Sequence, residues 1–229
     1  MKISIPQYLY WRKQQPCSAS INTNYVRVEL REMLRRGNTS FSTQGVGKNN
    51  WVFGSSPAAA RAAAGGVDGR LFATLAVNRV TSTGDSGQIG RIIIGQIHAN
   101  DDELVRLYYR KLPANSKGAI YIAHEKIGGE EDYFELVGSR SNSASSPAEG
   151  IALDEKFSYE IKVIGRHLKV SLLRPKRDPI IQYVDMSDSG YDAPGQYQYF
   201  KAGLYHVNNT ADVSDYAQVT FYQSENSHD

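Results

Sequence analysis

The chain has 229 residues, of which 41% are hydrophobic, 10% aromatic and 22% charged. A chain of this length and composition can bury a core and is not disordered, and no apolar run approaches the roughly 18 residues of a membrane-spanning helix. Its formal net charge of +2 is too small to indicate nucleic-acid binding by bulk electrostatics. Cys17 is the single cysteine, which excludes an internal disulfide, and residues 1–20 lack the apolar stretch of a secretory signal.

Alternation of apolar and polar residues dominates the chain and predicts strands rather than helices. In chain order the strand candidates are 25–32, 70–80, 90–98, 103–110, 119–124, 132–137, 157–163, 168–172, 180–184, 197–206 and 215–223. One helix is expected at 57–64, with Ser56 as its N-cap and Pro57 as its first residue. Because no repeat or linker interrupts this pattern, we expect one domain over 1–229, an all-β antiparallel sandwich or jelly roll.

The loops between these strands and the basic clusters carry weaker signals. Ser40–Asn50, Ser139–Gly150 and Asp185–Gly195 are small and polar, and we expect at least one of them to act as a mobile lid. The basic clusters at 27–36 and 166–177 are most often solvated faces, and less often a groove for an anionic polymer.

Several common active sites are excluded by spacing. The five histidines have no zinc-site spacing, and no Gly-x-Ser-x-Gly elbow is present. Gly45-Val46-Gly47-Lys48 lacks the hydroxyl residue and the following helix of a phosphate-binding loop. We therefore expect neither a metal nor an organic cofactor.

Three strand candidates place polar side chains on one face. Alternation groups Arg27, Glu29 and Arg31 in the first. The second presents Gln96 and His98, and the third presents the set Tyr199, Lys201 and Tyr205. Gly203 removes a side chain from the third face and leaves room for something to approach. Each strand alone fits an exposed polar row, but side by side they would form a cationic groove.

Such a groove suits the cleavage of a polyuronate by β-elimination. The C5 proton lies next to a carboxylate, whose charge must be neutralised before the proton can leave. Arg27, Gln96 and His98 offer a cation, an amide and an imidazole for that task. Tyr205 can exchange the proton if Lys201 and Arg31 depress its pKa, and His98 is the other candidate base.

The same segments resemble the signature motifs of alginate lyases of polysaccharide lyase family 7. Residues 27–31 are similar to Arg-(Ser/Thr)-Glu-Leu-Arg, residues 96–98 match Gln-(Ile/Val)-His, and residues 199–207 are similar to Tyr-x-Lys-Ala-Gly-x-Tyr-x-Gln. Val28 stands where the family has a hydroxyl residue, and Val207 where it commonly has Gln. The second departure leaves the substrate preference open.

The resemblance implies a jelly roll whose concave sheet binds alginate, with no cofactor. It implies catalytic roles for Arg27, Gln96, His98 and Tyr205, and substrate-binding or supporting roles for Glu29, Arg31, Tyr199 and Lys201. Ile97 favours guluronate-containing or mixed blocks. We further expect endolytic cleavage, a monomer, no nucleic-acid or membrane partner, and a secreted or periplasmic location.

Other functions remain open from the sequence. A non-catalytic carbohydrate-binding jelly roll for anionic polysaccharides also needs basic and aromatic groove residues. A lyase for another polyuronate such as glucuronan needs the same chemistry. A β-rich nucleic-acid binder, using the arginines at 27–36 and surface tyrosines, is the weaker alternative.

Overall fold

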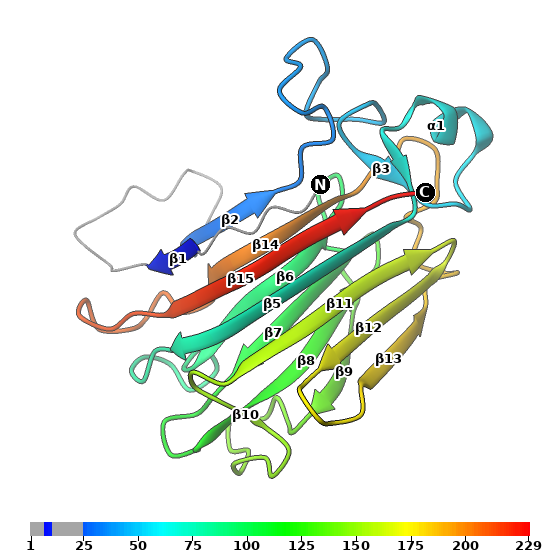
Figure 1. Ribbon diagram of the computed structural model, residues 1–229. Helices are drawn as coiled ribbons and strands as arrows, with labels where there is room; N and C mark the ends of the chain where they lie inside the picture. The colour runs from blue at the N-terminus through cyan, green and yellow to red at the C-terminus, as the bar shows by residue number, and fades with distance from the viewer. Residues whose placement is uncertain (1–6, 11–24) are drawn as a thin grey trace.

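Two antiparallel sheets stack face to face in the computed structural model, which describes residues 7–10 and 25–229 (Figure 1). The first, here called the back sheet, has the order β1 (Gln7–Tyr10), β15 (Gln218–Ser227), β5 (Gly69–Arg79), β11 (Lys156–Ile164), β12 (His167–Leu173), β13 (Ile180–Asp185). The second, here called the site sheet, has the order β10 (Ile151–Ala152), β8 (Lys117–Glu125), β7 (Val105–Arg110), β6 (Arg91–His98), β14 (Tyr199–His206), β2 (Arg27–Arg31), and β9 (Glu131–Val137) also pairs with β8. This is the nearly all-β antiparallel architecture that the alternation predicts.

The core lies between the sheets and follows from that alternation. On β11, Phe157, Tyr159, Ile161 and Val163 are buried, while the residues between them are half-buried. β11 and β12 form an antiparallel hairpin that closes from Ile164↔His167. The inward faces of both sheets join in one cluster of buried residues, and their burial is the main stabilising contribution to the fold.

An irregularity in β6 sets which side chains leave the core. Ile92 and Ile94 face the core, but after a register shift between Ile93 and Gly95 the next core residue is Ile97. The hydroxyl of Tyr159, from the back sheet, donates to the carbonyl of Ile94 at 2.9 Å, and a Cβ on Gly95 would meet that hydroxyl at 2.4 Å. The shift therefore turns Gln96 to the side away from the core, as a β-bulge re-aims a side chain.

Short elements depart from the sequence-based expectations. Helix α1 (Ala58–Ala63) lies at the predicted place, but Pro57 occupies the cap position without a side-chain bond, so the prediction of Ser56 as N-cap is wrong. The two-residue strands β3 (Trp51–Val52) and β4 (Gly66–Val67) pair in parallel beside α1 (Figure 1). Among the described residues, no helix is long and apolar enough to span a membrane.

Candidate active site

The three polar strands lie next to one another in the site sheet, in the order β6-β14-β2. Lys201 is the cross-strand partner of both Arg31 and Gln96, while Tyr205 is opposite Arg27 and Tyr199 is opposite His98. All eight predicted site residues lie on the strand faces that point away from the core, here called the site face. The predicted polar surface is therefore present, and His98 and Tyr205 share it.

Glu29 joins the three strands at the centre of the site face. Its carboxylate accepts a hydrogen bond from the Gln96 amide on β6 and forms an ion pair of 2.8 Å with Lys201 on β14. The side chain of Glu29 is only 3% exposed and that of Lys201 only 11%. Both oxygens of Glu29 are thus engaged by the protein, so Glu29 orients Gln96 and neutralises Lys201.

His98 is held in one tautomer. Its Nδ1 lies 2.7 Å from the carbonyl oxygen of Ala99, so Nδ1 carries the proton, and the unprotonated Nε2 lies 3.8 Å from a carboxylate oxygen of Glu103. Burial lowers the pKa of His98 below its usual value, although the Ala99 carbonyl and Glu103 oppose this. The ring also stacks on Tyr199, with centroids 5.1 Å apart. At neutral pH the ring is therefore an oriented base.

The pKa of Tyr205 is shifted in the opposite direction, upwards. Burial raises the pKa of its phenol, and Arg27, whose guanidinium lies 4.5 Å from the ring centroid, offsets part of this rise. The expectation that Lys201 and Arg31 depress this pKa is wrong, because Lys201 is neutralised by Glu29 and Arg31 lies over another tyrosine. Tyr205 is therefore protonated at neutral pH and suited to act as an acid.

Arg31 connects the site face to the loop at 40–50. Its guanidinium lies 3.8 Å from the centroid of the Tyr199 ring and donates to the carbonyl of Thr43 at 2.6 Å. Gln44 of the same loop accepts a hydrogen bond from Tyr197. The loop is thus anchored on the site, whereas its action as a lid stays a prediction.

Two positions of the third motif have structural explanations. A Cβ on Gly203 would lie 2.3 Å from the carbonyl oxygen of Val28, so the missing side chain makes room for the backbone of β2 rather than for a ligand. Val207 packs against an apolar cluster on the site face, formed by Ile93, Tyr108, Tyr121 and Ala123. An amide at position 207 would place a polar group against that cluster.

Sequence reasoning missed the part of the site face that β7, β8 and β9 supply. Tyr108 and Tyr121 stack with centroids 4.7 Å apart and are both buried, although they point away from the main core. Arg106 forms ion pairs with Glu125 and Glu131. Alternation along 105–110 does show Arg106, Tyr108 and Arg110 on one face, and this signal could have identified them.

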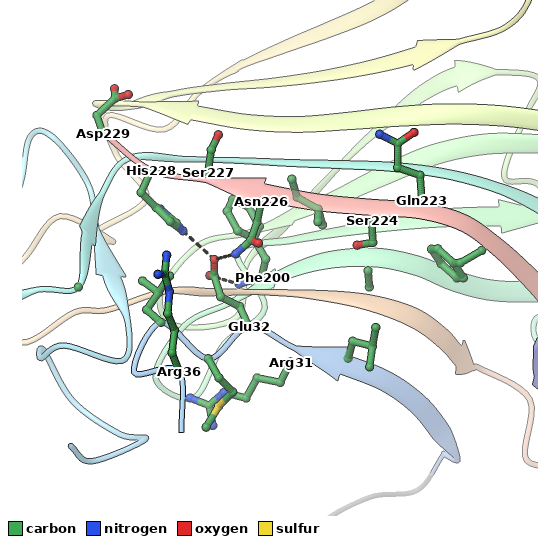
Figure 2. A pocket seen from close by; sticks show the side chains of 17 residues that line it. Arg31, Glu32, Arg36, Phe200, Gln223, Ser224, Asn226, Ser227, His228 and Asp229 are labelled. Carbon is green, nitrogen blue, oxygen red and sulfur yellow. Dashed lines mark hydrogen bonds and ion pairs between the residues drawn. The ribbon is translucent and has the colours of Figure 1, made fainter. Parts of the chain in front are cut away.

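A cavity of 680 Å³ lies away from this chemistry, between the edges of the two sheets. Arg31 is the only predicted site residue in its lining. At its centre, Glu32 accepts hydrogen bonds from the backbone N–H of Phe200 at 3.1 Å and from Asn226, and forms an ion pair of 2.7 Å with His228 (Figure 2). These contacts satisfy both carboxylate oxygens of Glu32. They also connect the end of β2 to β14 and to the C-terminal residues.

The basic cluster at 166–177 is largely paired with carboxylates in the described structure. Arg166 pairs with Asp192, Lys169 with Glu160, and Arg177 with Glu149, as expected for a solvated basic cluster. Within residues 7–10 and 25–229, no three His, Cys, Asp or Glu side chains are placed to hold a metal ion.

Comparisons with known proteins identify the family of this chain. The family model described as "Alginate lyase" matches residues 7–228. A curated alginate lyase from Klebsiella pneumoniae is 53% identical over 218 residues, which cover 91% of this chain and 71% of that protein. The crystal structure of the alginate lyase from Klebsiella pneumoniae superposes with a TM-score of 0.94 at 49% identity, covering 97% of this chain and 81% of that one. An alginate lyase structure from Pseudomonas aeruginosa gives a TM-score of 0.67 at 25% identity, covering 98% and 83%.

Solved members of polysaccharide lyase family 7 share the fold, one with a TM-score of 0.63 at 20% identity. The family membership does not favour a non-catalytic binding module, a nucleic-acid binder or a glucuronan lyase. The family model, the curated relative and the shared fold show that this chain belongs to the alginate lyase family and is a polysaccharide lyase.

Proposed function

We propose that this lyase cleaves guluronate-containing or mixed alginate blocks within the chain, using Arg27, Gln96, His98 and Tyr205. The observation that carries the proposal is the pairing of an unprotonated His98 with a protonated Tyr205 on one face. β-Elimination requires a base that is unprotonated and an acid that is protonated at neutral pH.

Neutralisation of the substrate carboxylate falls to Arg27 and Gln96. The Gln96 amide donates one Nε2 hydrogen to Glu29, which leaves its second hydrogen for a substrate oxygen. Arg27 forms no ion pair with any described carboxylate, so its charge is available to the uronate. Donors fixed in place before the charge develops stabilise the enolate-like transition state without reorganisation.

The elimination then follows with balanced electrons. His98 Nε2 takes the C5 proton, and the electrons of the C5–H bond form the C4–C5 double bond. The C4–O4 bond breaks, and the Tyr205 hydroxyl protonates the departing oxygen. The products are a new chain end and a 4,5-unsaturated uronate, and proton return from His98 to Tyr205 through water restores the enzyme.

The preference for guluronate follows from the separation of base and acid. Guluronate and mannuronate are epimers at C5, so their C5 protons leave from opposite faces of the ring. When the C5 proton and O4 lie on the same face, as in mannuronate, one tyrosine would have to act as both base and acid. The raised pKa of Tyr205 disfavours the phenolate that such a base requires.

Endolytic cleavage is supported by the position of the reacting residues. Gln96, Lys201 and Glu29 lie in the interior of their strands, and aromatic or charged side chains continue on both sides of them across the site face. A polymer bound there can extend beyond the reacting sugar in both directions. A monomeric state and a secreted or periplasmic location remain predictions from the resemblance.

The test is digestion of purified polyguluronate, polymannuronate and mixed-block alginate, followed by ultraviolet absorbance and by product sizing. We expect a higher kcat/KM on guluronate-containing polymers and a rapid early fall in chain length. Equal or faster cleavage of polymannuronate would contradict the assignment of base and acid. Release of only terminal units would contradict the endolytic mode.

A further inference from the structure

A second group of cations lies on the site face beyond Tyr205. Ile93 is the partner of Tyr205, and Arg91 is the next residue of β6 on the same face. Directly opposite Arg91, on β7, is Arg110. Arg110 donates to the backbone carbonyl of Arg140, in the loop that follows β9, which brings the third arginine to the same place. We call Arg91, Arg110 and Arg140 the distal arginines.

The distal arginines surround the stacked tyrosines of the site face. Burial raises the pKa of Tyr121 to about 12, and the charges of Arg91, Arg110 and Arg140 all act to lower it. The guanidinium of Arg140 lies 3.9 Å from the centroid of the Tyr133 ring. The result is a patch of cations set among aromatic rings, a combination suited to a charged sugar, since rings can pack against its apolar face.

Their charge is not neutralised by the described part of the protein. Arg110 donates to the carbonyl of Ser86 at 2.7 Å and to the side-chain oxygen of Asn142 at 3.0 Å, which are neutral acceptors. No described carboxylate lies within ion-pair distance of Arg91, Arg110 or Arg140, whereas Arg106, on the same face of β7, has two.

This arrangement has a cost in the free protein. Like charges directly opposite each other on neighbouring strands are destabilising. Arg110 is only 3% exposed, and burial together with the charge of Arg91 lowers its pKa. The Nε atoms of both Arg91 and Arg110 are buried without a hydrogen-bond partner. An anion bound beside Arg91, the half-buried member of the pair, would relieve the repulsion.

We propose that the distal arginines form an additional binding site for the carboxylate of a uronate unit, remote from the scissile bond. The proposal rests on the proposed function, because the carboxylate belongs to the alginate chain that Tyr205 cleaves. A guanidinium binds a carboxylate through two parallel N–H···O bonds, which Arg91 can offer. Arg110, whose Nη atoms already donate to three oxygens of the protein, adds its positive charge. The site then contributes to polymer affinity and to product length, without touching the reacting atoms.

The test compares Arg91→Ala and Arg140→Ala with the parent. Arg110 is left intact because it holds two loops. Arg70→Ala is the matched control, since Arg70 is a half-buried arginine on the outer face of β5 in the back sheet and pairs there with Glu160. Each variant is assayed on polyguluronate and on a guluronate trisaccharide, and folding is checked by circular dichroism and Tm.

We expect KM for the polymer to rise about tenfold in each distal variant, which corresponds to about 1.4 kcal/mol. The value of kcat should stay within twofold, because this binding is equal in the ground and transition states. The kinetic constants of the distal variants on the trisaccharide should match those of the parent. The control Arg70→Ala should match the parent in its KM for the polymer and in its early product lengths. Arg91→Lys should recover part of the loss, and the final products of Arg91→Ala should be longer.

Unchanged polymer KM and product lengths in both folded distal variants would overturn the proposal. An equal loss on polymer and trisaccharide would also overturn it, since that result places the arginines at the reacting sugar. Failure of the proposed function is a separate result. In that case the parent would bind oligoguluronate without cleaving it, and calorimetry would still report whether the distal variants bind more weakly.

Discussion

Replacing Glu29 by glutamine removes the charge at the centre of the site face while keeping the shape of the side chain. The partners left behind are Lys201, 11% exposed, and the fully buried Gln96. Loss of one partner from a buried ion pair destabilises a protein by roughly 3–5 kcal/mol. Because Lys201 retains some contact with water, we expect the free energy of unfolding to fall by about 2–4 kcal/mol, and Tm by roughly 5–15 °C.

The same substitution should also reduce catalysis. The glutamine amide keeps one acceptor oxygen for two donors and turns an NH2 group towards the other, so Gln96 and Lys201 cannot both keep their present hydrogen bonds. A misplaced group near the reacting atoms lowers the rate by about 100-fold. The assay is kcat on polyguluronate at a temperature where the variant is fully folded, beside urea unfolding. Glu29→Asp, which keeps the charge on a shorter side chain, should recover stability more than kcat.

Glu160→Gln is the control for the Glu29 experiment. Glu160, like Glu29, binds two side chains, here the cations Arg70 at 2.5 Å and Lys169 at 3.2 Å, but it lies on the back sheet, where both partners are about a third exposed. Exposed pairs contribute about 0–1 kcal/mol, so this variant should lose little stability and no activity. If Glu29→Gln lost no more stability and no more activity than Glu160→Gln, the positioning role of Glu29 would be refuted.

Three further results are expected. Because the pKa of His98 is lowered, the acid limb of kcat/KM against pH should lie below pH 6.5, and a limb above that value would argue against His98 as the base. The pKa of His228 is raised, chiefly by Glu32 against the effect of burial, so its stabilising contribution is complete below about pH 6.5 and is lost as pH rises through the raised value. Urea unfolding between pH 6 and 9 should show this loss in the parent but not in His228→Gln. Shortening the loop over 41–48 removes the Thr43 carbonyl that Arg31 binds and should raise KM more than it changes Tm, and an unchanged KM would mean that the loop is idle.

The strands and the site face could be predicted from sequence because alternation specifies faces directly. Phe157, Tyr159 and Ile161 are buried as the pattern requires, and Gln96 and His98 do share a face. The pattern does not show the register shift beside Gly95, because a bulge depends on the partner strand and on Tyr159 from the other sheet. The two-residue strands β3 and β4 are likewise too short to produce a period.

Electrostatic roles were harder to predict than positions. Lys201 is near Tyr205 in the sequence and Arg31 belongs to another of the polar strands, but their charges are engaged by Glu29 and by the Tyr199 ring and loop carbonyl. Spacing along a strand cannot show whether a cation is already paired. For the same reason, the burial that raises the pKa of Tyr205 appears only when the surrounding strands are assembled.

The most direct test of the central claim is the activity of Tyr205→Phe on alginate. The substitution keeps the ring, its packing and its contact with Arg27, and removes only the hydroxyl that donates the proton. The account predicts that the rate of absorbance increase from unsaturated uronate falls by about 10²–10⁴-fold, while oligosaccharide binding is nearly unchanged. A folded Tyr205→Phe enzyme that cleaves alginate at close to the parent rate would contradict the assignment of Tyr205 as the proton donor.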